Sequence, residues 1–109
     1  MPGATLPGAQ SINEQNVYLA LQRLKIEFAF QKPLNGGRTV RGGQVVDFVL
    51  YIPPRPVALY IDGLYWHKSK PEDEIKRAEA EQMGYRVEAI SEADSMTMEK
   101  SIEALRKII

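Results

Sequence analysis

The fold is decided by two apolar runs, GQVVDFVL at residues 43–50 and VALYIDGLYWH at residues 57–67. β-Branched and aromatic residues dominate both runs, which predicts two adjacent strands at residues 44–52 and 57–62. Each strand carries an aspartate, which is a residue that strands disfavour because a carboxylate resists burial. Asp47 lies inside the first strand, and Asp62 ends the second.

His67 follows Asp62 by five residues and is the single histidine of the chain. Two acids on neighbouring strands with an imidazole close behind can hold a divalent metal ion and activate a water molecule. A plainer interpretation stays open for each residue. Asp47 can be an acid at a sheet edge or one bonded to a loop, Asp62-Gly63 can be an ordinary turn, and His67 can be packed.

The chain before these strands predicts a helix and a weak strand. Residues 1–10 have no periodicity and resemble a loose arm. Ser11 and Glu14 have the spacing of a capping box, so a helix is expected to begin there. Glu14 either caps that helix or points its carboxylate at the site. The buried stripe of this helix is expected to be Val17, Ala20, Leu21, Leu24 and Phe28.

A weak strand at residues 27–32 is expected to stop at Pro33. Residues 35–43 contain four glycines together with Arg38 and Arg41. Such a segment is typical of a hairpin connection, since glycine permits positive φ, and it can also approach a phosphate backbone closely.

The C-terminal part predicts a helix, a strand and a second helix. Pro71 suits a first helical turn, and Gly84 ends the helix near Met83. Asp73 is placed to interact with the positive end of the helix dipole, or to orient His67. Ile75, Ala78 and Met83 are expected to face inward. A strand at residues 85–90 follows, and then a helix from about Ser95 with the stripe Met98, Ile102, Leu105 and Ile109.

The predicted order of elements is therefore helix, three strands, helix, strand, helix, which is an α/β fold. The strand–helix–strand step predicts a parallel pair, and the first three strands can form an antiparallel meander. Both faces of the central strands are apolar, so helices should cover the mixed four-stranded sheet on both sides. After the arm, residues 11–109 form one domain.

Composition narrows the class of protein. The 109 residues are 44% hydrophobic and include no cysteine, so the chain should fold without disulfides or thiolate metal sites. It has no apolar run of about 18 residues and no signal-peptide pattern, which predicts a soluble, cytoplasmic protein with no membrane partner. Fourteen basic residues balance fourteen acidic ones. This balance argues against a general nucleic-acid coat but allows a local basic face.

Candidates for such a face lie in the loops around the two strands, where they can also be ordinary solvated side chains. They are Arg38, Arg41, Arg55, Lys68 and Lys70. Tyr65 and Trp66 can stack on bases or wedge into a duplex, or they can be core residues.

The order of these residues resembles that of a known family. A helix with Glu14, a strand with Asp47, a strand ending in Asp62 and then Trp66-His67 resemble the restriction-endonuclease-like PD-(D/E)XK superfamily. Residues 61–67 are most similar to very-short-patch repair (Vsr) endonucleases and to homing-type relatives from phages and introns. Those relatives share a Glu, Asp, variable, His, Asp (EDxHD) pattern. On that pattern the matching positions are Glu14, Asp47, His67 and Asp73.

The resemblance implies a DNA endonuclease that depends on Mg²⁺ or Mn²⁺ and works in a bacterial or phage-infected cell. Asp47 would bind the metal, together with either the Asp62 carboxylate or the Ile61 backbone carbonyl. His67 would activate water or assist the departing oxygen, and Glu14 and Asp73 would orient these groups. A homodimer or larger complex would be one way to cut both strands. The residues expected to contact DNA are Arg38, Arg41, Tyr65, Trp66, Lys68 and Lys70.

The chain departs from the families it resembles in two respects. The usual acid, variable, Lys motif is replaced by Asp62-Gly63-Leu64. This fits the His-containing branch, but it also fits a nuclease fold that has lost its activity. A catalytically inactive nucleic-acid-binding or assembly module is therefore the alternative function. The zinc ligands of the mismatch-repair enzymes have no counterpart here.

Overall fold

The structure, a computed structural model, describes residues 12–34, 37, 44–62 and 71–109; the side chains of residues 62 and 71–73 are not among the described parts. The expected arm at residues 1–10 also lies outside this range. The elements in chain order are α1 (Ile12–Arg23), β1 (Phe28–Leu34), β2 (Gln44–Leu50), β3 (Val57–Asp62), α2 (Pro71–Gln82), β4 (Arg86–Ser91), a short 3₁₀ helix η2 (Ala93–Ser95) and α3 (Met98–Ile108).

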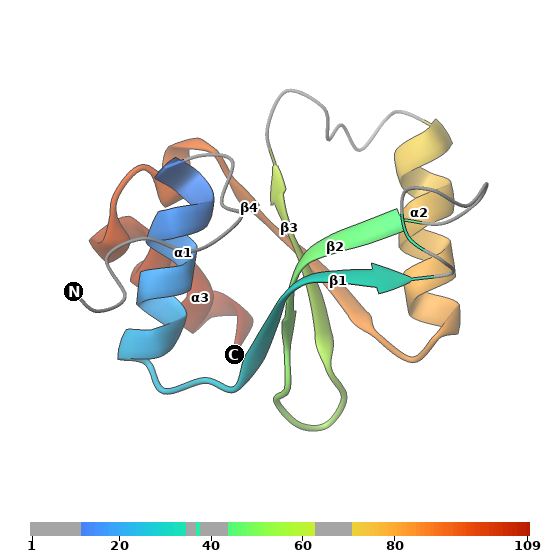
Figure 1. Cartoon of the computed structure of the whole chain (residues 1–109), viewed down its shortest axis with the longest axis horizontal. Helices are drawn as coiled ribbons and strands as arrows, with labels where there is room; N and C mark the ends of the chain where they lie inside the picture. Colours follow the sequence, from blue (N-terminus) through green and yellow to red (C-terminus); the bar gives the residue numbers. More distant parts are fainter. Residues whose placement is uncertain (1–11, 35–36, 38–43, 63–70) are drawn as a thin grey trace.

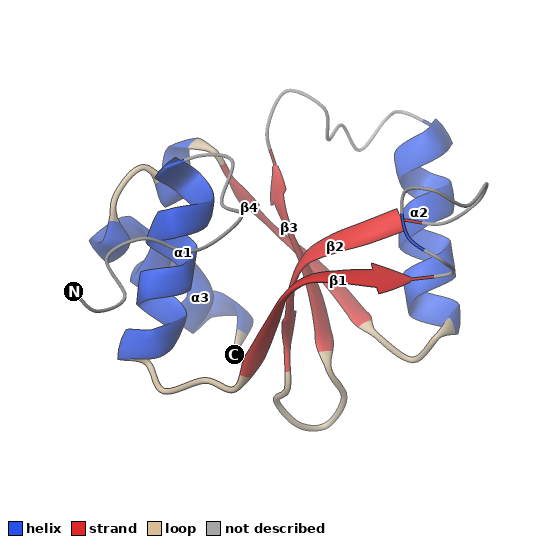
Figure 2. Ribbon diagram, in the orientation of Figure 1, coloured by secondary structure: helices blue, strands red, loops and turns tan. Residues whose placement is uncertain are grey.

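The strands form one mixed sheet, as predicted (Figure 2). Among the described residues its order is β1-β2-β3-β4. β1 pairs with β2 and β2 with β3 in antiparallel fashion, while β3 and β4 are parallel. β1 and β4 are consequently the edge strands. In the described part of the chain, no helix is long and apolar enough to cross a membrane.

Helices cover both faces of the sheet, which confirms the prediction from the apolar strands. α1 and α3 lie side by side against one face, and α2 lies against the other (Figure 1). The buried core under α1 and α3 consists of Val17, Ala20, Leu21, Phe48, Leu50, Val57, Leu59, Ile90 and Leu105. The smaller core under α2 consists of Leu34, Val46, Val49, Ala58, Tyr60, Ala80 and Val87.

The inward face predicted for α2 is wrong. Ile75 is 61% exposed, Met83 is 48% exposed and Ala78 is also exposed. Among the side chains of this helix that the structure describes, residues 74–82, only Ala80 is buried. The helix thus packs on the sheet through a small residue, and a polar contact also joins it to β2. The Gln44 side chain of β2 donates a hydrogen bond to the backbone carbonyl of Lys76 at 3.0 Å.

Two other boundaries differ from the prediction. Pro33 does not stop the first strand but lies within β1, where it pairs with Val45. An edge strand tolerates proline, because a backbone N–H that points away from the sheet makes no hydrogen bond to a neighbouring strand, and proline lacks only that N–H. The last helix begins after Thr97 rather than at Ser95, because the Thr97 hydroxyl accepts a hydrogen bond from the Lys100 amide at 3.1 Å and caps it.

The same C-terminal motif ends α1 and α2. In α1 the Ile26 amide donates to the Leu21 carbonyl, and Lys25 has a φ of +58°. In α2 the Tyr85 amide donates to the Ala80 carbonyl, and Gly84 has a φ of +96°. This six-to-one bond with a left-handed residue is the Schellman motif. Glycine adopts that conformation without steric cost, whereas lysine does not.

This difference gives a matched pair of substitutions. Lys25→Gly should raise the free energy of unfolding by about 0.5–1 kcal/mol, because it removes left-handed strain. Gly84→Ala should lower the free energy of unfolding by about 1–2 kcal/mol through φ alone, since a Cβ there would meet nothing within 4 Å. Urea denaturation of both variants measures the effect. Equal destabilisation by the two changes would contradict this account of the helix ends.

Candidate functional site

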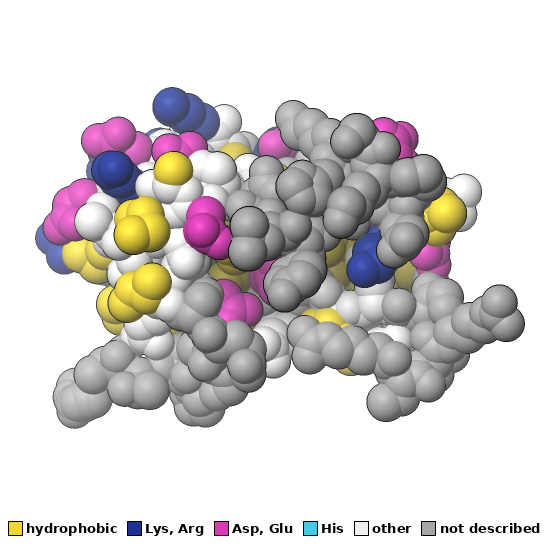
Figure 3. Space-filling model, turned by 90° about the horizontal axis from the view of Figure 1, so that it is seen from above, with side chains coloured by type: hydrophobic (Ala, Val, Ile, Leu, Met, Phe, Trp, Pro, Cys, Tyr) yellow, Lys and Arg dark blue, Asp and Glu magenta, His cyan; other side chains and the backbone are white. Residues whose placement is uncertain are grey.

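The carboxyl ends of β3 and β4 lie next to each other, where Asp62 pairs with Ser91. The chain continues from β3 to α2 on one face of the sheet and from β4 to η2 and α3 on the other (Figure 1). In open α/β sheets, such a divergence of connections creates a crevice at the strand ends where ligands bind. This end of the sheet is therefore the expected place for a site. The view from above (Figure 3) looks onto it and shows acidic side chains near the middle of the face.

Asp47 lies where the β1–β2 pair is interrupted. The register runs from Phe28↔Leu50 to Leu34↔Gln44 but passes over Gln31 and Asp47. Gln31 there has a φ of +53°, which is a left-handed conformation that side chains other than glycine rarely adopt. Backbone strain of this kind persists only where the surrounding structure enforces it, and it is concentrated at functional sites.

The side chains change faces at this interruption. In a regular strand Val46 and Phe48 would point to the same side. Instead Val46 belongs to the core under α2, and Phe48 belongs to the core under α1 and α3. On the opposing strand, Phe30 packs against the first core and Leu34 lies in the second. Asp47 is thus the residue at which β2 turns over.

The same residue lies where β2 and β3 stop pairing. Their ladder ends with Phe48↔Leu59, and beyond it an Asp47 carboxylate oxygen, Oδ2, accepts a hydrogen bond from the Ile61 amide at 2.8 Å. The side chain replaces a main-chain partner for that amide. This contact explains physically why an aspartate is present inside a strand. It also holds the carboxylate against Ile61, the residue that precedes Asp62 in β3.

Glu14 lies in the first turn of α1 and is only 7% exposed. It is three and seven residues before Val17 and Leu21, so it lies on the same buried side of the helix. A carboxylate is also favoured near a helix N-terminus by the helix dipole. The capping role remains a prediction, because Ser11 lies outside the described residues.

The other predicted site residues are only partly described. The backbone of Asp62 ends β3 as expected, and Asp73 lies in the first turn of α2, but neither side chain is described. The remaining candidates belong to segments outside the described residues. They are Arg38, Arg41, Tyr65, Trp66, His67, Lys68 and Lys70. Among described side chains, no three His, Cys, Asp or Glu residues gather closely enough to hold a metal ion, but Asp62, His67 and Asp73 are not part of that set.

Sequence reasoning missed a buried polar contact beside Asp47. The Tyr60 hydroxyl donates a hydrogen bond to the Gln44 side-chain oxygen, Oε1, at 2.6 Å, and both residues are buried. Burial raises the pKa of the Tyr60 phenol above its ordinary value, and the negative charges of Asp47 and Glu79 raise it further. Tyr60 is thus a neutral donor that links β3 to β2. Its place in an apolar run predicts only a core residue.

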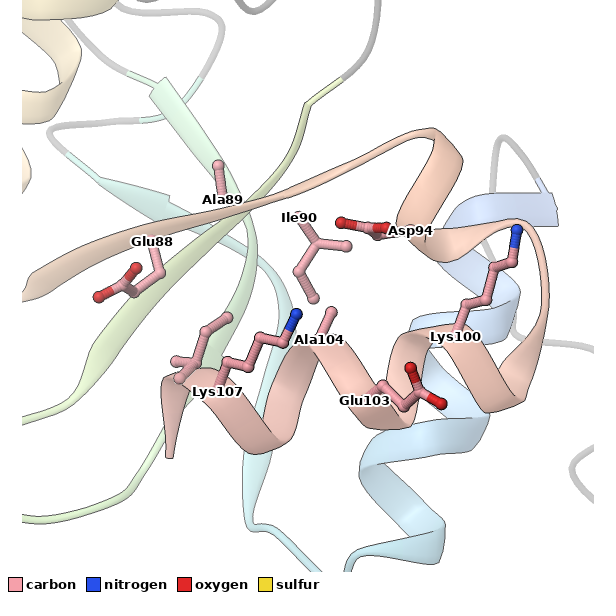
Figure 4. Close-up of a pocket in the computed structure, with 9 residues that line it drawn as sticks. Glu88, Ala89, Ile90, Asp94, Lys100, Glu103, Ala104 and Lys107 are labelled. Carbon is pink, nitrogen blue, oxygen red and sulfur yellow. The ribbon is translucent and has the colours of Figure 1, made fainter.

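A separate hollow of about 370 Å³ lies between β4 and α3 (Figure 4). Ile90 of β4 points toward Ala104 of α3, and charged side chains of both signs surround them. The charged residues are Glu88, Asp94, Lys100, Glu103 and Lys107. Of the predicted site residues whose side chains the structure describes, neither Glu14 nor Asp47 lines this hollow.

Comparison with known proteins finds no significant match: no protein-family model matches the sequence, and searches of curated proteins and of solved structures find none. The resemblance drawn from the residues therefore stays a prediction.

The Ile61–Asp47 contact predicts how two substitutions at position 47 will differ. Asp47→Asn keeps a side-chain oxygen that can accept from the Ile61 amide, so the protein should stay close to wild-type stability. Asp47→Ala leaves that amide without its partner and should lower the free energy of unfolding by about 1–3 kcal/mol. Urea denaturation compares them. Equal stability of the two variants would show that the amide does not depend on the carboxylate.

The buried phenol predicts a dependence on pH. At pH 8, Tyr60→Phe should lower the free energy of unfolding by about 1 kcal/mol, because Gln44 loses its donor. A phenol whose pKa is raised in the folded state contributes stability below its unfolded pKa, near 10.0, and loses it as pH rises further. The difference between wild type and Tyr60→Phe should therefore shrink between pH 10 and 11. A difference that stays constant over this range would mean that the phenol titrates normally.

Proposed function

We propose that this chain is a metal-dependent DNA endonuclease that hydrolyses phosphodiester bonds. The observation that carries the proposal is the carboxylate of Asp47, held by the Ile61 amide at 2.8 Å where β2 and β3 diverge. It stands beside the strand that delivers Asp62 to the carboxyl edge of the sheet. An acid fixed by the main chain at this position is already oriented, and an oriented ligand is what a metal site requires.

The arrangement of elements supports a restriction-endonuclease-like core. An N-terminal helix, an antiparallel meander of β1, β2 and β3, a crossover through α2 and a parallel β4 follow the order that the resemblance implies. Glu14, Asp47 and Asp62 then lie on α1, β2 and β3 respectively, as that resemblance requires. The alternative, an inactive module with the same fold, would keep this geometry and differ only in chemistry.

The chemistry of the donor set fits Mg²⁺ or Mn²⁺. These hard cations prefer carboxylate oxygens, and the Asp47 carboxylate is oriented by the hydrogen bond that it accepts from the Ile61 amide. Asp47 and Asp62 would hold the ion. When bound, the ion would lower the pKa of a coordinated water and neutralise charge on the phosphate.

The other predicted residues complete the proposal. His67, in the segment between β3 and α2, accepts a proton from the attacking water or gives one to the departing oxygen. Glu14 and Asp73 orient the water or the imidazole. Arg38 and Arg41 contact phosphates from the segment between β1 and β2. From the segment after β3, Lys68 and Lys70 also contact phosphates, and Tyr65 and Trp66 stack on bases.

The proposal predicts cleavage of DNA that requires the metal and Asp47. Supercoiled plasmid and duplexes with mismatches or branches would be incubated with the protein and Mg²⁺ or Mn²⁺. Nicking should stop when the metal is chelated, and it should fall at least about 100-fold in Asp47→Asn and in His67→Ala. Asp47→Asn is the more informative variant at this position than Asp47→Ala. It removes the negative charge but retains an oxygen that can accept from the Ile61 amide, so a loss of cleavage cannot be ascribed to a loss of stability.

Glu103→Gln is the matched control, since it also removes one acidic charge but lies in the hollow between β4 and α3. It should cleave like the wild type. Cleavage that survives in Asp47→Asn would show that the active site is elsewhere. Intact DNA under every condition, with a melting temperature that Mn²⁺ does not change, would favour the inactive module instead.

A further inference from the structure

Three buried polar side chains join the first turn of α1 to the segment that leaves β4. The Asn13 side-chain amide donates to the Glu92 carbonyl at 2.9 Å and to the Ser95 hydroxyl at 3.0 Å. The Asn16 amide donates to the Ser95 carbonyl at 2.9 Å. Asn13, Asn16 and Ser95 are all buried. These side chains, called here the asparagine clamp, therefore fix α1 to the chain between β4 and α3.

The clamp continues to the carboxyl edge of the sheet. The Ser95 hydroxyl donates to the Ser91 carbonyl at 2.9 Å, and Ser91 is the partner of Asp62 in the β3–β4 register. The first turn of α1 is thereby connected through Ser95 to the strand ends where the candidate site lies.

Packing alone does not require amides at these positions. Asn13 and Asn16 lie beside the stripe of Val17 and Ala20, where apolar side chains would bury area without needing partners. Apolar contacts are non-directional, however, whereas hydrogen bonds fix both the distance and the rotation of a helix. Glu14 and Gln15 lie between its two amides, and of these two Glu14 is the buried one. The clamp therefore sets the direction of the Glu14 side chain.

We infer that Asn13, Asn16 and Ser95 are positioning residues that aim the Glu14 carboxylate at the carboxyl ends of β3 and β4. This inference rests on the proposed function. The clamp does not touch the substrate. It acts by holding the first turn of α1 in one rotation, so that the carboxylate stays close to the geometry that the reaction needs.

The test is a double-mutant cycle on cleavage rates. Asn16→Ala should lower kcat about tenfold or more with little change in KM, since small misplacements of a catalytic group are costly. In the Glu14→Gln background the same change should have almost no further effect, because there is no carboxylate left to aim. Gln22→Ala is the matched control. It removes an exposed hydrogen bond on the same helix, which the Gln22 side-chain amide donates to the Tyr18 hydroxyl at 3.1 Å. It should leave kcat unchanged.

An equal loss of kcat in both backgrounds would overturn the inference, because it would show a purely structural role. If Asn16→Ala fails to fold, Asn16→Leu keeps the side-chain volume and removes only the hydrogen bond. A second readout separates this inference from the proposed function. In ¹³C NMR at neutral pH, the Glu14 carboxyl resonance should shift in the clamp variant and stay in place in Gln22→Ala. A shifted resonance in a protein that cuts no DNA would support the clamp and reject the nuclease, and an unshifted resonance would reject the clamp.

Discussion

The hydrogen bond from the Ile61 amide to the Asp47 carboxylate is the contact on which the rest of the structure depends. It lies where two constraints meet, because β2 turns over at Asp47 and also stops pairing with β3 there. An amide left without a partner at that point would cost about 1–3 kcal/mol. A carboxylate supplies the acceptor and also places a negative charge beside the carboxyl edge of the sheet. One residue thus serves both the fold and the candidate site.

β2 contributes side chains to both helical layers, and Val49 after the turnover packs under α2. Before the turnover β2 contributes Val46 to the core under α2, and after it β2 contributes Phe48 and Leu50 to the core under α1 and α3. The larger core is reinforced by Phe48, whose ring lies 5.8 Å from that of Phe28 and 5.2 Å from that of Phe30. The smaller core instead relies on the polar contacts of Gln44.

Much of the fold could be predicted from periodicity, because strands and helices differ in the spacing of their apolar residues. The order of elements, the mixed sheet and the positions of Asp47 and Asp62 in their strands were predicted in this way. The inward face of α2 was not, since among its described side chains only Ala80 is buried, and the polar bond from Gln44 to the Lys76 carbonyl also ties this helix to the sheet. The asparagine clamp was also missed. Its partners are about 80 residues apart, and a polar residue in a helix predicts solvent exposure when read from sequence alone.

The central claim is that Asp47 is fixed by Ile61 in a position to bind a metal ion, and the most direct measurement is a titration with paramagnetic Mn²⁺ followed by ¹H–¹⁵N NMR. If the claim is right, the amide signals of Asp47 and Ile61 broaden first at substoichiometric Mn²⁺, and this selective broadening disappears in Asp47→Asn. Broadening that starts instead at Glu88, Asp94 and Glu103, or that is the same in Asp47→Asn, would contradict it.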